Sequence, residues 1–129
     1  MFTFNKQERL KKRKEIDALF TSGNKIKEHP VTFFWNEREA DDDVPLKIGF
    51  SVSQKTVKSA VKRNRIKRQM REVYRLYKKE VFVGLENDPK KYAAMLIYTS
   101  TEMPSYEILK EKIILILDRY IENVKGHTS

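Results

Sequence analysis

The chain has no cysteine and only two histidines, His29 and His127. Without cysteine it can form no disulfide and no thiolate metal site, which suits a reducing compartment. No apolar run approaches the roughly 18 residues that a membrane span requires. The first residues, Met1–Lys14, lack the unbroken apolar stretch of a signal peptide. These absences predict a cytoplasmic protein with no membrane contact.

Groups that could catalyse hydrolysis are also scarce. A protein nuclease needs acid–base side chains or a carboxylate metal site. His29 precedes a proline in a predicted loop and His127 lies near the end of the chain. Asp41, Asp42 and Asp43 are adjacent in a predicted turn, so they cannot all converge on one ion, and we expect a solvated loop there. The sequence therefore predicts no catalytic residue and no metal ligand.

Positive charge is abundant and unevenly placed. Lysine and arginine number 27 against 18 acids, for a formal net charge of +9. The last 49 residues hold six of these cations and seven acids, so the first 80 carry a net charge of +10. A basic part beside a nearly neutral part predicts a face that binds a polyanion.

Hydrophobic periodicity and turn residues divide the chain into helices and strands of a single domain, residues 1–129, with 125–129 as a frayed tail. We expect helices at Leu10–Ser22, Val57–Val81 and Tyr106–Val124, a short extended piece at Lys25–Lys27, and strands at Val31–Asn36, Leu46–Val52 and Tyr92–Thr99. The strands flanking the acidic turn Glu37–Val44 suggest a hairpin, and the continuous apolar run Tyr92–Thr99 suggests a central strand. This order predicts an α+β sandwich, with helices packed on one mainly antiparallel sheet.

The segment Val57–Lys79 carries ten cations against one acid, Glu72. On a helix, one face gathers apolar residues, namely Ile66, Met70, Val73 and Tyr77. The opposite face gathers polar ones, namely Asn64, Lys67, Arg68, Arg71, Arg75 and Lys78. Like charges four residues apart on a helix repel, and a bound polyanion would neutralise that repulsion. The planar guanidinium group of arginine is also suited to binding phosphate. The helix is therefore expected to dock by one stripe and present a cationic stripe to a polyanion. The alternative is an ordinary solvated helix face.

Three stretches of this sequence resemble the protein subunit of bacterial ribonuclease P. The first is the opening, with Arg9-Leu10-Lys11-Lys12-Arg13, Phe20 and Gly23. The second is Ser51-Val52-Ser53-Gln54-Lys55. The third and most specific is Ala60-Val61-Lys62-Arg63-Asn64-Arg65-Ile66-Lys67-Arg68, followed by Arg71-Glu72 and Tyr74-Arg75. The resemblance is clear over roughly residues 4–80. The linker Thr56–Ser59 departs from the family because it lacks a glycine.

The resemblance implies a fold with a left-handed β–α–β crossover around the basic helix. It also implies a partnership with the catalytic RNA subunit, one protein per RNA, and removal of the 5′ leader from precursor tRNA. The RNA would perform the cleavage with Mg²⁺, and the protein alone would bind no cofactor. A general RNA- or ribosome-binding module remains the alternative, because charge alone supports it equally well.

The resemblance also assigns candidate site residues. Those expected to contact the catalytic RNA are Arg63, Asn64, Arg65, Lys67, Arg68, Arg71 and Arg75. Those expected to form a groove for the single-stranded leader are Phe20 and Phe34, with Lys12, Arg13, Lys55 and Lys58 supplying charge; Phe33 or Trp35 are further candidates. Single-stranded RNA is commonly held by aromatic faces with flanking cations. Because strand residues alternate, either Phe34 or the pair Phe33 and Trp35 must belong to the core.

Overall fold

The computed structural model describes residues 6–128, which form one short 3-10 turn, three α-helices and four strands. In chain order the elements are η1 (Lys6–Glu8), α1 (Arg13–Ser22), β1 (Asn24–Glu28), β2 (Val31–Arg38), β3 (Leu46–Val52), α2 (Ala60–Leu85), β4 (Lys91–Tyr98) and α3 (Tyr106–Thr128).

The four strands form one mixed sheet in the order β1-β2-β4-β3. β1 and β2 are antiparallel, as are β2 and β4, whereas β3 runs parallel to β4. The predicted hairpin of β2 and β3 is therefore wrong, because β4 lies between these two strands. The apolar run of β4 suits its inner place in the sheet, because its residues are buried on both faces. The hairpin that does form joins β1 to β2.

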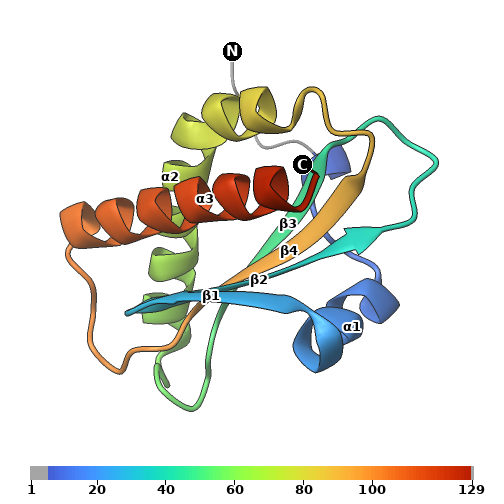
Figure 1. The fold of residues 1–129 in the computed structure, drawn as a ribbon. Coiled ribbons are helices and arrows are strands. Elements are labelled where there is room, and N and C mark those ends of the chain that lie inside the picture. The colour runs from blue at the N-terminus through green and yellow to red at the C-terminus, as the bar shows by residue number, and fades with distance from the viewer. Residues whose placement is uncertain (1–5, 129) are drawn as a thin grey trace.

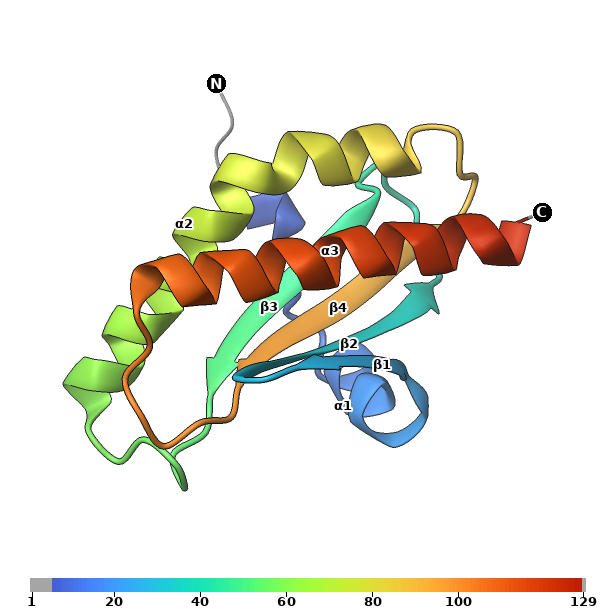
Figure 2. The ribbon, with the colours of Figure 1, turned by 60° about the vertical axis from the view of Figure 1, so that its left-hand side comes forward.

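The sheet separates two layers of helix, with α2 and α3 on one face and α1 on the other (Figures 1 and 2). The chain passes from β3 through α2 to β4, its parallel neighbour. When the sheet is viewed from the α2 side with these two strands pointing up, β4 lies to the left of β3 (Figure 2). The crossover is therefore left-handed, contrary to the usual rule. The fold is the α+β sandwich that the sequence predicts.

The main core lies between the sheet and the layer of α2 and α3. Phe33 and Trp35 of β2 point into it, and both rings pack at 5.2 Å from the ring of Tyr120 on α3. The helical spacing of Ile108, Leu109, Ile113, Ile116, Leu117 and Tyr120 predicts one buried stripe on α3, and all of them except Ile108 are buried. Ile108 was expected in that stripe, but it is 51% exposed because its position on the helix lies away from the sheet.

The start of α1, both ends of α2 and the end of α3 differ from the prediction. α1 begins at Arg13 rather than Leu10, because the preceding segment runs along the outer edge of β3, where the Leu10 amide donates to the Ile48 carbonyl at 3.2 Å. α3 continues to Thr128, so most of the segment predicted as a frayed tail is helical, and Ser129 lies outside the described residues. Ser105 caps α3 by accepting a hydrogen bond from the Ile108 amide.

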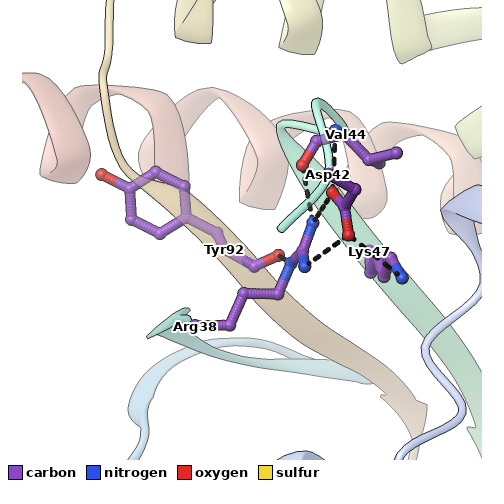
Figure 3. Close-up of polar contacts among 5 residues, drawn as sticks. All are labelled: Arg38, Asp42, Val44, Lys47 and Tyr92. Atoms are coloured by element: carbon purple, nitrogen blue, oxygen red, sulfur yellow. Dashed lines mark hydrogen bonds and ion pairs between the residues drawn. The ribbon is translucent and has the colours of Figure 1, made fainter. Parts of the chain in front are cut away.

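The acidic turn between β2 and β3 is fastened by Arg38 (Figure 3). Its buried guanidinium donates to both carboxylate oxygens of Asp42, at 2.8 and 3.2 Å, and to the carbonyls of Val44 and Tyr92. This hydrogen bonding holds the pKa of Asp42 well below its usual range. The expectation of a solvated acidic loop is therefore wrong for Asp42, although Asp41 and Asp43 are exposed.

Candidate RNA-binding site

The basic helix begins at Ala60, three residues later than predicted. Ser59 caps it by accepting a hydrogen bond from the Lys62 amide. The segment before it belongs to the loop, where Val57 is buried, which explains why Val57 is out of phase with the helix's apolar stripe. Arg63 donates to the carbonyls of Val57 and Lys58, at 2.9 Å each. One of the predicted RNA contacts thus also holds the loop against the first turn.

The two faces of α2 differ as the sequence predicts. Ile66, Met70 and Val73 are buried against the sheet, and Tyr77 is half-buried. The predicted RNA contacts on the other side are exposed or half-buried, the exposed ones being Asn64, Arg65, Arg68 and Arg71 and the half-buried ones Lys67 and Arg75. We call Asn64, Arg65, Lys67, Arg68, Arg71 and Arg75 the cationic stripe. Its side chains reach solvent along one flank of the molecule.

Lys78 was expected on the cationic stripe, and that expectation is wrong. It is 7% exposed, and its ammonium lies 2.9 Å from one carboxylate oxygen of Glu8 and 3.2 Å from the other. It also lies over the ring of Phe82, 5.7 Å from the centroid. A pattern of one helix cannot reveal this pair, because Glu8 arrives from η1, seventy positions earlier in the chain.

Arg75 differs from the other members of the stripe because it already has an acidic partner. Its guanidinium forms a two-pronged ion pair with Glu72, at 2.7 and 3.0 Å. This hydrogen bonding lowers the pKa of the Glu72 carboxyl and raises the pKa of Arg75. A phosphate at Arg75 would therefore compete with Glu72, whereas Arg65 and Arg68 lie in the more basic half of the stripe.

An aromatic residue that the sequence did not single out lies beside the stripe. Tyr106, the first residue of α3, lines an open hollow of about 370 Å³ together with Arg65, Arg68, Gln69 and Glu72. The sequence gives no signal for this contact, because it depends on how α3 crosses α2. The hollow places a half-buried ring next to two exposed guanidinium groups.

The predicted groove aromatics lie together on the α1 side of the sheet. The rings of Phe20 on α1 and Phe34 on β2 meet edge to face, with centroids 5.1 Å apart. Phe20 is 48% exposed and Phe34 is half-buried. The further candidates Phe33 and Trp35 are excluded from this surface, because both are buried on the opposite face of the sheet.

The four groove cations are all exposed, but they lie at two opposite ends of this face. Lys55 and Lys58 belong to the loop after β3, whose start is bonded to the Tyr98 end of β4. Lys12 lines a hollow of about 380 Å³ near the other end of β2, among acidic side chains that include Glu37 and Glu39. Arg13 lies 3.8 Å from Asp17 on the same helix. Lys55 and Lys58 thus belong to one loop, which lies at the end of the sheet opposite Lys12.

No group of three or more histidine, cysteine or acidic side chains that could hold a metal ion occurs among residues 6–128. Within the same range, no helix is both long enough and apolar enough to cross a membrane. His29 is exposed in the turn between β1 and β2, and the side chain of His127 lies outside what the structure describes.

The mixed sheet has a left-handed β3–α2–β4 crossover, and its connecting helix is cationic. These features define a small basic α+β protein with a surface suited to a polyanion. The Ribonuclease P family model matches residues 4–120. The ribonuclease P protein component of Chlorobium phaeobacteroides is 32% identical over 95% of this chain and 88% of its own. That of Geotalea uraniireducens is 34% identical over 92% of this chain and 95% of its own.

Solved structures agree on the fold. The RNase P protein of Thermotoga maritima superposes with a TM-score of 0.66 at 24% identity, covering 87% of this chain and 96% of that one. The protein of Staphylococcus aureus gives a TM-score of 0.67 at 18% identity, over 88% and 94% of the two chains. The chain therefore belongs to the ribonuclease P protein family. This family provides the protein component of an endoribonuclease of tRNA processing and works with the ribonuclease P RNA.

Proposed function

We propose that this chain binds the ribonuclease P RNA through the cationic stripe of α2 and holds the 5′ leader of precursor tRNA on the α1 side of the sheet. The observation that carries the proposal is the two-faced character of α2. Ile66, Met70 and Val73 on one face are buried in the core, while the polar residues Asn64, Arg65, Arg68 and Arg71 are exposed. Guanidinium groups bind phosphate in a two-pronged geometry, so such a stripe is suited to an RNA backbone.

The leader is assigned to the other side of the sheet because of the Phe20–Phe34 pair. Stacking of a base on an aromatic ring contributes about 1–3 kcal/mol and tolerates any base sequence. Phe20 is the more exposed of the two rings, and Phe34 lies edge-on beside it. Lys55 and Lys58 add positive charge at the end of the face nearest the β3–α2 loop. This combination of rings and cations suits a single strand rather than a duplex.

The cleavage itself is assigned to the RNA subunit, which would use Mg²⁺. Among the described residues, the side chains that could act in hydrolysis are His29, which is exposed in a turn, and carboxylates that are scattered or already paired. Asp42, for example, is paired with Arg38. The protein's contribution is then to position substrate and to neutralise phosphate charge. We assign one protein to each RNA.

Reconstitution tests this proposal directly. The protein is mixed with a bacterial ribonuclease P RNA, and cleavage of precursor tRNA is followed at low Mg²⁺ concentration. We expect the protein to stimulate cleavage at the leader junction, and no stimulation would refute the proposal. A general RNA- or ribosome-binding module would instead bind RNA with a steep salt dependence and show no preference for tRNA that carries a leader.

A further inference from the structure

The edge strand β1 carries two lysines that the proposed site does not yet include. Ile26 is buried in the core, whereas Lys25 and Lys27 on either side of it are exposed. Because side chains of a strand alternate between its faces, both lysines lie on the side of the sheet opposite the core. That is the side of α1 and of the Phe20–Phe34 pair.

The strand register places Lys25 beside Phe34 and Lys27 two residues further along the same edge. Lys25 is the partner of Phe34 on β2, and Lys27 is the partner of Thr32. The Lys25 ammonium lies over the ring of Phe34, 5.6 Å from its centroid. A cation above a ring is attracted by the negative charge of the ring face. The positive charge of Lys25 is thus held at the ring that we assign to the leader.

The charge of these lysines is not cancelled by a described neighbour. Among residues 6–128, no ion pair involves Lys25 or Lys27, while the acids closest in the chain are engaged elsewhere. Glu28 accepts from Arg119 at 2.6 Å, and Asp17 lies beside Arg13. Side chains of lysine that carry an uncompensated charge at an aromatic surface are suited to a phosphate.

One row of paired residues joins the two sets of cations across the sheet, although Thr32 within it is buried. Lys27 pairs with Thr32, Thr32 with Ile97 of β4, and Ile97 with Ser51 of β3. Beyond Ser51 the chain enters the loop that carries Lys55. The row therefore begins at Lys27 and ends next to the loop of Lys55, and Phe34 lies two residues from Thr32 on β2.

We propose that Lys25 and Lys27 bind the phosphates of leader nucleotides that have passed the Phe20–Phe34 pair, so that the RNA leaves the protein over β1. Residues two apart on a strand are separated by about 6.6 Å, far enough for each ammonium to contact a different phosphate. The ligand is the backbone of single-stranded RNA, read without base specificity. This inference rests on the proposed leader site and extends it to the edge of the sheet.

The test uses the reconstituted holoenzyme with the Lys25→Gln/Lys27→Gln variant and two precursor tRNAs, one with a leader ending at the aromatic pair and one with a longer leader. We expect about a 3- to 10-fold loss of affinity for the long-leader substrate and no change for the short one. The salt dependence for the long leader should fall by about 1.4 in slope, since each phosphate contact on a single strand contributes about 0.7. The matched control is Lys110→Gln, an exposed lysine on α3.

Two further variants separate phosphate binding from a structural effect on Phe34. Lys25→Arg/Lys27→Arg keeps both charges and should restore affinity for the long leader. Lys27→Gln alone leaves the cation over Phe34 in place and should still lower the salt slope. Equal losses for both substrates, or no loss for either, would overturn the inference. If Phe34→Ala still weakens leader binding in that case, the proposed leader site stands, and if it does not, that site fails as well.

Discussion

At the scale of single residues, burial decides which aromatic side chains are free to bind. Phe33 and Phe34 are adjacent in the sequence, yet Phe33 is fully buried against Tyr120 while Phe34 meets the exposed ring of Phe20. The alternation of the strand requires that they face opposite sides. Which side is core depends on where α3 packs, and the sequence of β2 by itself does not contain that information.

Replacement of Phe34 by alanine should therefore affect one substrate more than another. We expect Phe34→Ala to lower the affinity of the holoenzyme for leader-bearing precursor tRNA by about 1–3 kcal/mol, the range for one stacked base. Mature tRNA, which has no leader, should bind with unchanged affinity. Binding titrations with both ligands measure the difference, and equal losses would show that Phe34 serves only as packing.

Asp42 makes stability depend on pH in a defined direction. Arg38 holds the pKa of this carboxyl below its usual range in the folded protein, whereas in the unfolded chain it titrates near 3.9. On acidification, Asp42 therefore takes up its proton at a higher pH in the unfolded state than in the folded state. The stabilisation from the Arg38–Asp42 pair is fully present above about pH 5 and is lost as the pH falls below about 4. We expect Asp42→Asn to be less stable at neutral pH.

The measurement is urea unfolding at several pH values. The difference in stability between wild type and Asp42→Asn should shrink on acidification. Asp41→Asn is the matched control, because Asp41 is exposed and should leave the profile unchanged. A difference that stays constant from neutral pH to pH 3 would contradict the role assigned to Arg38.

At the scale of elements, α2 combines an RNA contact surface with a structural one. Arg65 and Arg68 are exposed, so we expect Arg65→Ala and Arg68→Ala to weaken binding to the RNA subunit while changing the free energy of unfolding by less than about 0.5 kcal/mol. Each should also lower the salt slope by about 1. Filter binding across a salt series, together with urea unfolding, tests both statements.

Arg63 provides the contrast on the same helix. Its guanidinium holds the carbonyls of Val57 and Lys58, so Arg63→Ala should lose stability as well as RNA affinity. If Arg65→Ala unfolds as readily as Arg63→Ala, the side chain of Arg65 is structural and the assignment of the stripe is incorrect.

The elements themselves were largely predictable, because their signals are local. The strand Leu46–Val52 has the predicted bounds. The pairing of the strands was not predictable, since no local sequence signal shows that β4 separates β2 from β3. Lys78 was misplaced for the same reason, as its partner Glu8 is distant in sequence. Family resemblance supplied Phe34 as a candidate; only the register revealed Lys25 beside it.

At the scale of the whole molecule, the Glu8–Lys78 pair ties the N-terminal segment to the C-terminal half of α2. Both residues are nearly buried. Removing one partner leaves a buried charge without its counterion, which costs about 3–5 kcal/mol, whereas replacing both partners with apolar residues is often neutral. We expect Glu8→Met to be strongly destabilised and Glu8→Met/Lys78→Met to recover most of the loss. Thermal unfolding of the three proteins decides this, and an equally unstable double variant would contradict it.

The central position of β4 also has a consequence during synthesis on the ribosome. Residues 91–98 pair with both β2 and β3, so the sheet is incomplete until they have been translated. The earlier chain already contains nearly all the positive charge, but the apolar face of α2 then lacks most of the core on which it packs. A ribosome-bound chain that stops before β4 should thus expose a basic, unpacked helix amid ribosomal RNA. Rapid completion of this last strand would limit the time for such off-target association.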